Sequence, residues 1–266
     1  MGRHLWAFDV DGTLLRSDGT MSRAVREALR SLAEAGDVVA LATGRSLAAT
    51  REVLELLPWV EWAVCANGAA TLHRGGPRAR PHALVHHHDL PAAPLVRHVL
   101  TTDTAARVAV EDASGTCAVN EHFEPGELMG VSERREVGLL GAHGAFRVTV
   151  RPSRPGTTFG FEHDVSVLAR PDIGRRTWFD LVAPGVDKAT ALERVRVRLG
   201  IEPGRTHAAG DESNDVGMVR WAAHGAALGD RCTELAAVAD RVLPDADADG
   251  VLDFLAGAAT TRPVAG

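Results

Sequence analysis

Short apolar runs alternate with helical segments along this chain, and the alternation is interrupted in the middle of the sequence. The apolar runs at 5–8, 38–42 and 62–66 have the length of buried strands, and helical spacing fills the intervals between them. Ser22 and Gly36 are placed to begin and end the first of these helices. Short strands that alternate with helices predict a parallel sheet covered by helices on both faces.

The alternation stops near residue 76 and returns near residue 184. The intervening region contains short strand-like runs separated by Gly, Pro and Arg turns, at 83–87, 107–111, 146–150, 165–169 and 178–182. A helix at 188–199 and a strand at 207–209 then restore the first pattern. We predict an α/β fold: a three-layer, Rossmann-like parallel-sheet core formed by residues 1–76 and 184–266, with an inserted α+β cap domain at 77–183.

Two carboxylates, Asp9 and Asp11, follow the first predicted strand. Residues two apart on an extended segment face the same way, so the pair is expected to converge. Converging carboxylates at the end of a buried strand repel each other and lose hydration, and a divalent cation would offset both costs. Gly12 allows a sharp turn directly after them. Taken alone, the segment also fits a solvated Asp-Gly turn.

The second strand ends in Thr43-Gly44, whose hydroxyl and backbone N–H can bind phosphoryl oxygens. Taken alone, this pair also fits the start of the next helix. Lys188 is the single lysine among 29 basic residues, and it begins the helix that follows the insertion. Taken alone, Lys188 also fits a solvated surface lysine. Because every other basic side chain is arginine, however, this position is expected to need a compact point charge of the kind that suits a phosphoryl group.

Another strand leads into Asp211, Asn214 and Asp215. This group alone also fits a capping cluster for the following helix. In open α/β sheets, however, ligands bind beyond the carboxyl ends of the strands, and all four polar segments are expected at or beside such ends. Their joint occurrence predicts one shared site.

These four segments resemble the motifs of the haloacid dehalogenase-like hydrolase superfamily. The segment Asn67-Gly68-Ala69 after the third strand, and the position of the insertion, resemble the Cof-type branch, which has a large inserted cap at this place. The resemblance covers the core, roughly 1–76 and 184–259. The four motifs stand as Asp9-Val10-Asp11-Gly12-Thr13-Leu14, Thr43-Gly44-Arg45, Lys188, and Gly210-Asp211-Glu212-Ser213-Asn214-Asp215.

The resemblance implies the roles of these residues. Asp9 is expected to attack phosphorus and form an aspartyl phosphate, while Asp11 protonates the leaving oxygen and later activates water. The implied cofactor is Mg²⁺, held by Asp9, by the main chain around Asp11 (the Val10 carbonyl being one candidate) and by Asp211, with Asp215 in an outer or water-mediated position. The phosphoryl oxygens are expected to be bound by Thr43, Gly44, Lys188 and Asn214.

Composition excludes several other classes of partner. The net charge is −6, the pI is near 6.0 and the sequence has no basic run, so neither nucleic acid nor an anionic membrane is expected as a partner. Cys65, Cys117 and Cys232 are far apart, which argues against a disulfide framework or a structural zinc site. With no signal-peptide pattern near Met1, we expect a cytoplasmic protein. The oligomeric state is left open.

The function expected from these features is magnesium-dependent hydrolysis of a phosphate monoester of a small metabolite, a sugar phosphate being one candidate. Two alternatives share the phosphorylated aspartate. One is a phosphomutase or phosphotransferase of the same superfamily. The other is a receiver-like signalling module, but such modules are much shorter and have no large insertion.

Overall fold

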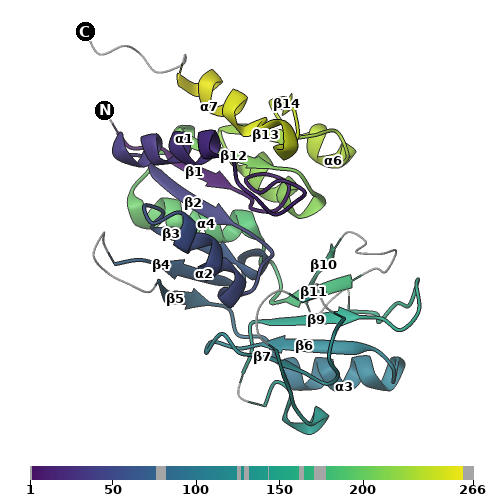
Figure 1. Ribbon diagram of the computed structural model, residues 1–266. Coiled ribbons are helices and arrows are strands. Elements are labelled where there is room, and N and C mark those ends of the chain that lie inside the picture. The colour runs from purple at the N-terminus through teal and green to yellow at the C-terminus, as the bar shows by residue number, and fades with distance from the viewer. Residues whose placement is uncertain are drawn as a thin grey trace.

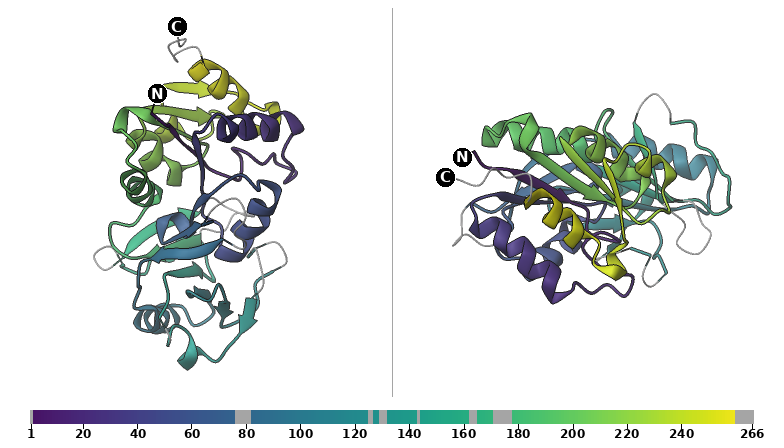
Figure 2. Two further views of the ribbon diagram at one scale, coloured as in Figure 1. Left: turned by 90° about the vertical axis from the view of Figure 1, so that its left-hand side faces the viewer. Right: turned by 90° about the horizontal axis from the view of Figure 1, so that it is seen from above.

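The computed structural model shows two sheets of unequal size (Figure 1). The larger sheet has the order β14-β13-β12-β1-β2-β3-β4-β5, and the smaller has the order β10-β11-β9-β6-β7-β8. Figure 2 shows that the two sheets form two lobes of the molecule. The residues described are 2–75, 82–124, 127–128, 132–142, 144–161, 165–170 and 178–259.

The larger sheet is parallel from β14 to β3, with β1 near its centre. The last two strands, β4 and β5, run antiparallel to their neighbours. In sheet order, the strands are β14 (Arg241–Leu243), β13 (His224–Leu228), β12 (Thr206–Gly210), β1 (Leu5–Phe8), β2 (Val38–Ala42), β3 (Trp62–Cys65), β4 (Ala70–His73) and β5 (Ala83–His87).

Helices cover both faces of this sheet because its strands are apolar on both sides. Trp6 and Phe8 belong to one buried cluster and Leu5 and Ala7 to another, as the alternation along a strand requires. The first cluster includes side chains of α1 (Arg23–Glu34), α2 (Leu47–Leu56) and α7 (Val251–Ala259). The second includes side chains of α4 (Lys188–Leu199), α5 (Val216–Trp221) and α6 (Thr233–Ala236). The predicted three-layer core is confirmed.

The strand at 83–87 lies in a different place from the one expected. The sequence assigns it to the insertion, but it pairs with β4 and extends the larger sheet. The assignment of this strand to the insertion is therefore wrong. Its composition does not distinguish the edge of one sheet from a strand of another, because pairing is set by long-range contacts.

The smaller sheet is built entirely from the inserted region. One of its faces packs against α3 (Ala92–Thr102), where Val96 and Val99 meet Val108 and Val148. Its strands are β10 (Ser166–Arg170), β11 (Trp178–Val182), β9 (Arg147–Arg151), β6 (Arg107–Glu111), β7 (Cys117–Val119) and β8 (Ser132–Arg134).

Short 3₁₀ turns connect several of these elements, and two of them lie at the candidate site. They are η1 (Ala66–Gly68), η2 (Val137–Leu139), η3 (Pro203–Arg205), η4 (Ser213–Asp215) and η5 (Ala246–Ala248). Across the described parts of the chain, no helix combines the length and the apolar character needed to cross a membrane.

Candidate active site

The predicted site residues gather at the carboxyl edge of the larger sheet. Asp9 directly follows β1, and its backbone N–H donates to the Ala209 carbonyl of β12 at 3.0 Å. Thr43 directly follows β2, and Asp211 directly follows β12. The parallel order of β12, β1 and β2 therefore brings together residues that are far apart in the sequence.

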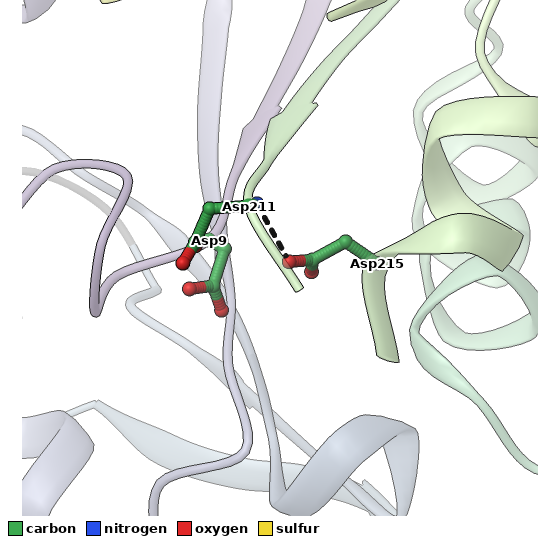
Figure 3. Close-up of side chains that lie close together, drawn as sticks. All are labelled: Asp9, Asp211 and Asp215. Atoms are coloured by element: carbon green, nitrogen blue, oxygen red, sulfur yellow. Dashed lines mark hydrogen bonds between the residues drawn. The ribbon is translucent and has the colours of Figure 1, made fainter. Parts of the chain in front are cut away.

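Three carboxylates form the centre of this site (Figure 3). Asp9, Asp211 and Asp215 each offer an oxygen, and these oxygens lie within 4.8 Å of one another. Asp215 is fully buried, and its Oδ2 accepts the backbone N–H of Asp211 at 3.0 Å and that of Glu212 at 3.1 Å. The turn after β12 is thus folded around the Asp215 side chain.

Lys188 reaches this cluster from the first turn of α4. Its Nζ lies 2.6 Å from Asp9 Oδ1 and 2.6 Å from Asp215 Oδ1, and the residue is 1% exposed. Burial alone would lower the pKa of Lys188, but Asp215 and Asp9 outweigh burial and raise that pKa above its ordinary value. The amine is therefore a permanent cation held between two carboxylates.

When all three carboxylates are ionised, their negative charge exceeds the single positive charge of Lys188. Burial raises the pKa of Asp9 well above its ordinary value, despite the opposing effect of Lys188. Burial, and then the charge of Asp215, raise the pKa of Asp211 to about 7. Clustered carboxylate oxygens with raised pKa values are the donor set that a hard divalent cation fits, because such a cation favours the ionised form of each ligand.

Asp11 lies outside this cluster, contrary to the expectation that it converges with Asp9. Its carboxylate is paired with the Arg45 guanidinium, at 2.8 Å from Nε to Oδ2 and 2.5 Å from Nη2 to Oδ1. The reason is that β1 ends at Phe8, so the alternation of an extended strand no longer applies at Asp11. The chain then turns at Gly12, which has a φ of 78° and lies so close to Asp211 that a Cβ would be 2.1 Å from Oδ2.

The loop after β2 is held by its own threonine. Thr43 is 1% exposed, and its Oγ1 accepts the Arg45 backbone N–H at 3.1 Å. The Thr43 carbonyl accepts the backbone N–H of Asn67 at 3.0 Å. A Cβ at Gly44 would lie 3.1 Å from Asn67 Oδ1, so this loop and η1 are in close contact.

Asn214 contacts Asn67, which in turn contacts the loop after β2. Its Nδ2 donates to Asn67 Oδ1 at 2.9 Å. The structure thus brings Asp9, Lys188, Asp211 and Asp215 into direct contact, with Thr43, Gly44 and Asn214 grouped around Asn67. The individual roles given to these residues remain predictions.

Some residues that contact the site have no role in the sequence prediction. Arg45 and Asn67 appear there only as members of motifs. Glu111 and Arg147 of the smaller sheet contact the loop after β2, and Asp180 contacts Asn67. The signal for Glu111, Arg147 and Asp180 is a charged residue within a strand. That signal does not by itself say what the residue contacts.

Comparison with known proteins defines the class. A family model described as haloacid dehalogenase-like hydrolase matches residues 6–88 and 161–255. The chain belongs to this family of hydrolases, and the identification made from the sequence motifs is confirmed.

Relatives extend the similarity over nearly the whole chain. A phosphoglycolate phosphatase from Natronomonas pharaonis is 28% identical over 263 residues, covering 96% of this chain and 98% of its own. An HMP-PP phosphatase from Cronobacter sakazakii is 28% identical over 257 residues, covering 88% of this chain and 86% of its own. Among solved structures, BT1666 from Bacteroides thetaiotaomicron, described among the phosphatases of the haloalkanoate (HAD) enzyme superfamily, has a TM-score of 0.78 at 22% identity and covers 96% and 94%. The predicted core with its cap is this shared fold.

Proposed function

We propose that this hydrolase is a magnesium-dependent phosphatase that cleaves a phosphate monoester of a small metabolite through an aspartyl phosphate on Asp9. The observation that carries the proposal is the position of Asp9, buried at the carboxyl end of the central strand and in contact with Lys188. A carboxylate held beside a permanent cation at a site with further carboxylates is suited to attack a phosphoryl group.

Magnesium would be held by Asp9 and Asp211, with main-chain oxygen from the segment Val10–Asp11. Both oxygens of Asp215 already have partners, Lys188 on one and two backbone N–H groups on the other. This supports an outer position for Asp215, in which it orients Lys188 and the turn at Asp211. When bound, Mg²⁺ would neutralise phosphoryl charge and align the group for in-line attack.

The chain itself supplies the remaining phosphoryl contacts. Lys188 Nζ lies against Asp9, so it can donate to a phosphoryl oxygen as the Asp9 charge is used to form the new bond. The Thr43 hydroxyl already accepts from Arg45, so its own proton remains to be donated. The Asn214 amide uses one N–H on Asn67 and keeps the other for substrate.

Asp11 is proposed as the general acid and base. In the first step, an Asp9 oxygen bonds to phosphorus, the ester P–O bond breaks, and Asp11 gives a proton to the leaving oxygen. In the second step, Asp11 takes a proton from water as the water oxygen attacks phosphorus and releases Asp9. Arg45 binds both Asp11 oxygens in this structure and so fixes the direction in which the carboxylate points. To act as the acid, Asp11 would keep one of these contacts and carry its proton on the other oxygen.

The division of labour between the lobes is part of this proposal. Residues 1–88 and 184–266 form the catalytic core, and the region between them forms a cap that encloses the substrate and selects its leaving group. The phosphatases similar to this chain support a small phosphorylated metabolite as the substrate, with a sugar phosphate as one candidate class. The three cysteines are free thiols, which supports a reducing, cytoplasmic location.

The experiment is a screen of phosphorylated metabolites with MgCl₂ and with chelator. We expect orthophosphate release equal to substrate loss, with Mg²⁺ required. A product that retains the phosphoryl group on an added alcohol or sugar would instead identify the phosphotransferase alternative. Full turnover in chelator would contradict the metal requirement.

A further inference from the structure

The smaller sheet presents a buried polar face to the catalytic core. Glu111, Arg147, Thr149 and Asp180 lie on the face opposite α3, and each is 5% exposed or less. The strand register places Glu111 opposite Arg147 and Thr149 opposite Asp180. Charged groups are costly to bury unless they are paired and hydrogen-bonded, so the partners of these side chains indicate what they are for.

The first set of contacts leads from this face to the loop after β2. Arg147 Nη2 donates to Glu111 Oε2 at 2.6 Å, and its Nη1 donates to the Gly44 carbonyl at 2.5 Å. The second Glu111 oxygen accepts the backbone N–H of Leu47, the first residue of α2, at 2.7 Å. This ion pair of the smaller sheet therefore holds both sides of the segment that contains Gly44 and Arg45.

These contacts fix a peptide group that Thr43 also binds. Arg147 holds the oxygen of the peptide between Gly44 and Arg45, and Thr43 Oγ1 accepts its N–H. As long as the peptide keeps this orientation, the Thr43 oxygen is occupied as an acceptor and its proton is directed elsewhere. The guanidinium of Arg147 thus helps to set the direction of a hydroxyl that it does not touch.

The second set of contacts leads to Asn214. Asp180 accepts the Thr149 hydroxyl at 2.6 Å and the Asn67 amide Nδ2 at 3.2 Å. Because a carboxylate can only accept, it requires the NH₂ side of Asn67 to face it. The Asn67 oxygen then faces Asn214 and accepts from its amide at 2.9 Å, so the orientation of one amide determines that of the next.

We infer that Glu111, Arg147 and Asp180, here called the cap relay, are positioning residues for phosphoryl binding. They set the orientation of Thr43, Gly44 and Asn214 from the smaller sheet, without contact with the reacting atoms. The inference rests on the proposed phosphatase function. It assigns the cap a part in phosphoryl binding in addition to enclosing the substrate.

The test compares Asp180→Asn with Glu127→Gln. Both variants replace a carboxylate of the inserted region by its amide. Glu127 pairs with Arg151, and both side chains are largely buried. Among the described residues, this pair makes no hydrogen bond to the loop after β2 or to Asn67. We expect Asp180→Asn to raise the inhibition constant of orthophosphate about tenfold and to lower kcat, since a lost orienting hydrogen bond typically has an effect of this size. Glu127→Gln should change neither, whatever it does to the melting temperature.

A double-mutant cycle separates positioning from general support. If Asp180 acts through the Asn214 amide, then Asp180→Asn should have little further effect on phosphate inhibition in an Asn214→Ala background. Glu127→Gln should leave the inhibition constant of orthophosphate unchanged in either background. Equal effects of Asp180→Asn with and without Asn214, or a loss of melting temperature with unchanged phosphate inhibition, would overturn the inference.

The outcomes also separate this inference from the proposed function. If the wild-type protein hydrolyses no phosphate ester and binds no orthophosphate, the function fails. If the wild-type protein is active and the relay variant behaves like Glu127→Gln, only the inference fails. Should Asp180→Asn not fold, Asn67→Ala interrupts the same connection from the core side and is judged by the same cycle.

Discussion

Asp9 and Asp11 have different surroundings although a single residue separates them. Asp9 is buried against Lys188, whereas the side chain of Asp11 is 49% exposed and paired with Arg45. A buried carboxylate in contact with a cation suits a nucleophile, and an accessible one suits a group that must exchange protons with a leaving group and with water.

We therefore predict that Asp9→Asn and Asp11→Asn slow different steps of the reaction. Asp9→Asn should lower turnover of an aryl phosphate by about 10⁴-fold or more, because the attacking oxygen is lost. Asp11→Asn should lower turnover by about 10²- to 10⁴-fold and should accumulate phosphoenzyme, because an aryl leaving group needs little protonation but water still needs a base. Rapid quench with labelled substrate measures both. Equal losses with no trapped phosphoenzyme would contradict the separate roles.

Lys188 is predicted to contribute to stability as well as to chemistry. Lys188→Met leaves Asp9 and Asp215 buried without their cation, so the free energy of unfolding in chelator should fall by about 3–5 kcal/mol. Lys188→Arg keeps the charge, so its free energy of unfolding should fall less than that of Lys188→Met. The larger planar group of arginine should nevertheless lower kcat about a hundredfold. Urea denaturation and steady-state kinetics distinguish the two effects. A Lys188→Met protein that unfolds at the same urea concentration as wild type would show that the amine only binds substrate.

At the scale of single elements, α4 is placed by a close approach of two turns. Gly68 in η1 has a φ of 106°, and a Cβ there would lie 2.0 Å from the Asp187 carbonyl, directly before Lys188. Asp187 caps the helix by accepting the Thr190 backbone N–H at 2.7 Å. Movement of Asp187 would therefore move Lys188.

Gly68→Ala is predicted to damage both stability and turnover, with Gly36→Ala as its control. Both glycines have positive φ, which costs an alanine about 1–2 kcal/mol. A Cβ at Gly36 meets nothing within 4 Å, so that variant should lose stability only. Gly68→Ala should lose more stability than Gly36→Ala and should also lower kcat, because the start of α4 must shift. Thermal melts and kinetics measure both, and equal kinetics for the two variants would refute the link to Lys188.

The elements of the core were largely predictable because their signals are local. The helix at Lys188–Leu199 has the predicted bounds, with Asp187 as its cap and Gly200 in a left-handed conformation at its end. By contrast, α3, β4 and β7 were not predicted. β4 and β7 are short runs, and α3 contains Pro94, which also fits a turn. Packing against residues distant in the sequence stabilises these elements.

At the scale of the molecule, the larger sheet holds three mutually repelling carboxylates in place. In metal-free protein, the pKa of Asp211 is raised from 3.8 to about 7, so the folded state binds more protons than the unfolded state between these values. Its contribution to the free energy of unfolding is present below the lower value and is lost as the pH rises through the upper one.

We predict that chelator lowers the melting temperature more at pH 8 than at pH 5. Mg²⁺ should restore the loss at pH 8, since it binds the ionised carboxylates, and should do little at pH 5. Asp211→Asn should lose both the dependence on pH over this range and the stabilisation by Mg²⁺. Differential scanning calorimetry with and without MgCl₂ is the measurement. Identical melting temperatures at pH 8 with and without Mg²⁺ would refute a metal site at these carboxylates.

The site was predictable to the extent that it depends on strand ends. Asp9, Lys188, Asp211 and Asp215 meet because the order of a doubly wound sheet follows from alternating elements. The position of Asp11 was predicted wrongly although β1 ends at Phe8 as expected, because the geometry of an extended strand does not continue past that end into the turn at Gly12. The cap relay depends on how the two sheets face each other, and no local pattern specifies that arrangement.

The position of β1 in the larger sheet also affects the protein during synthesis. β1 pairs with β2 on one side and with β12 on the other, and β12 begins at Thr206. At about 5–20 residues per second, a ribosome needs roughly 10–40 s to make the chain between them. Throughout that interval one edge of an apolar strand lacks its partner, while α3 and the strands from β6 to β9 are complete within a contiguous stretch. The inserted lobe is thus able to fold first on the ribosome, and the catalytic core is completed only when its second half emerges.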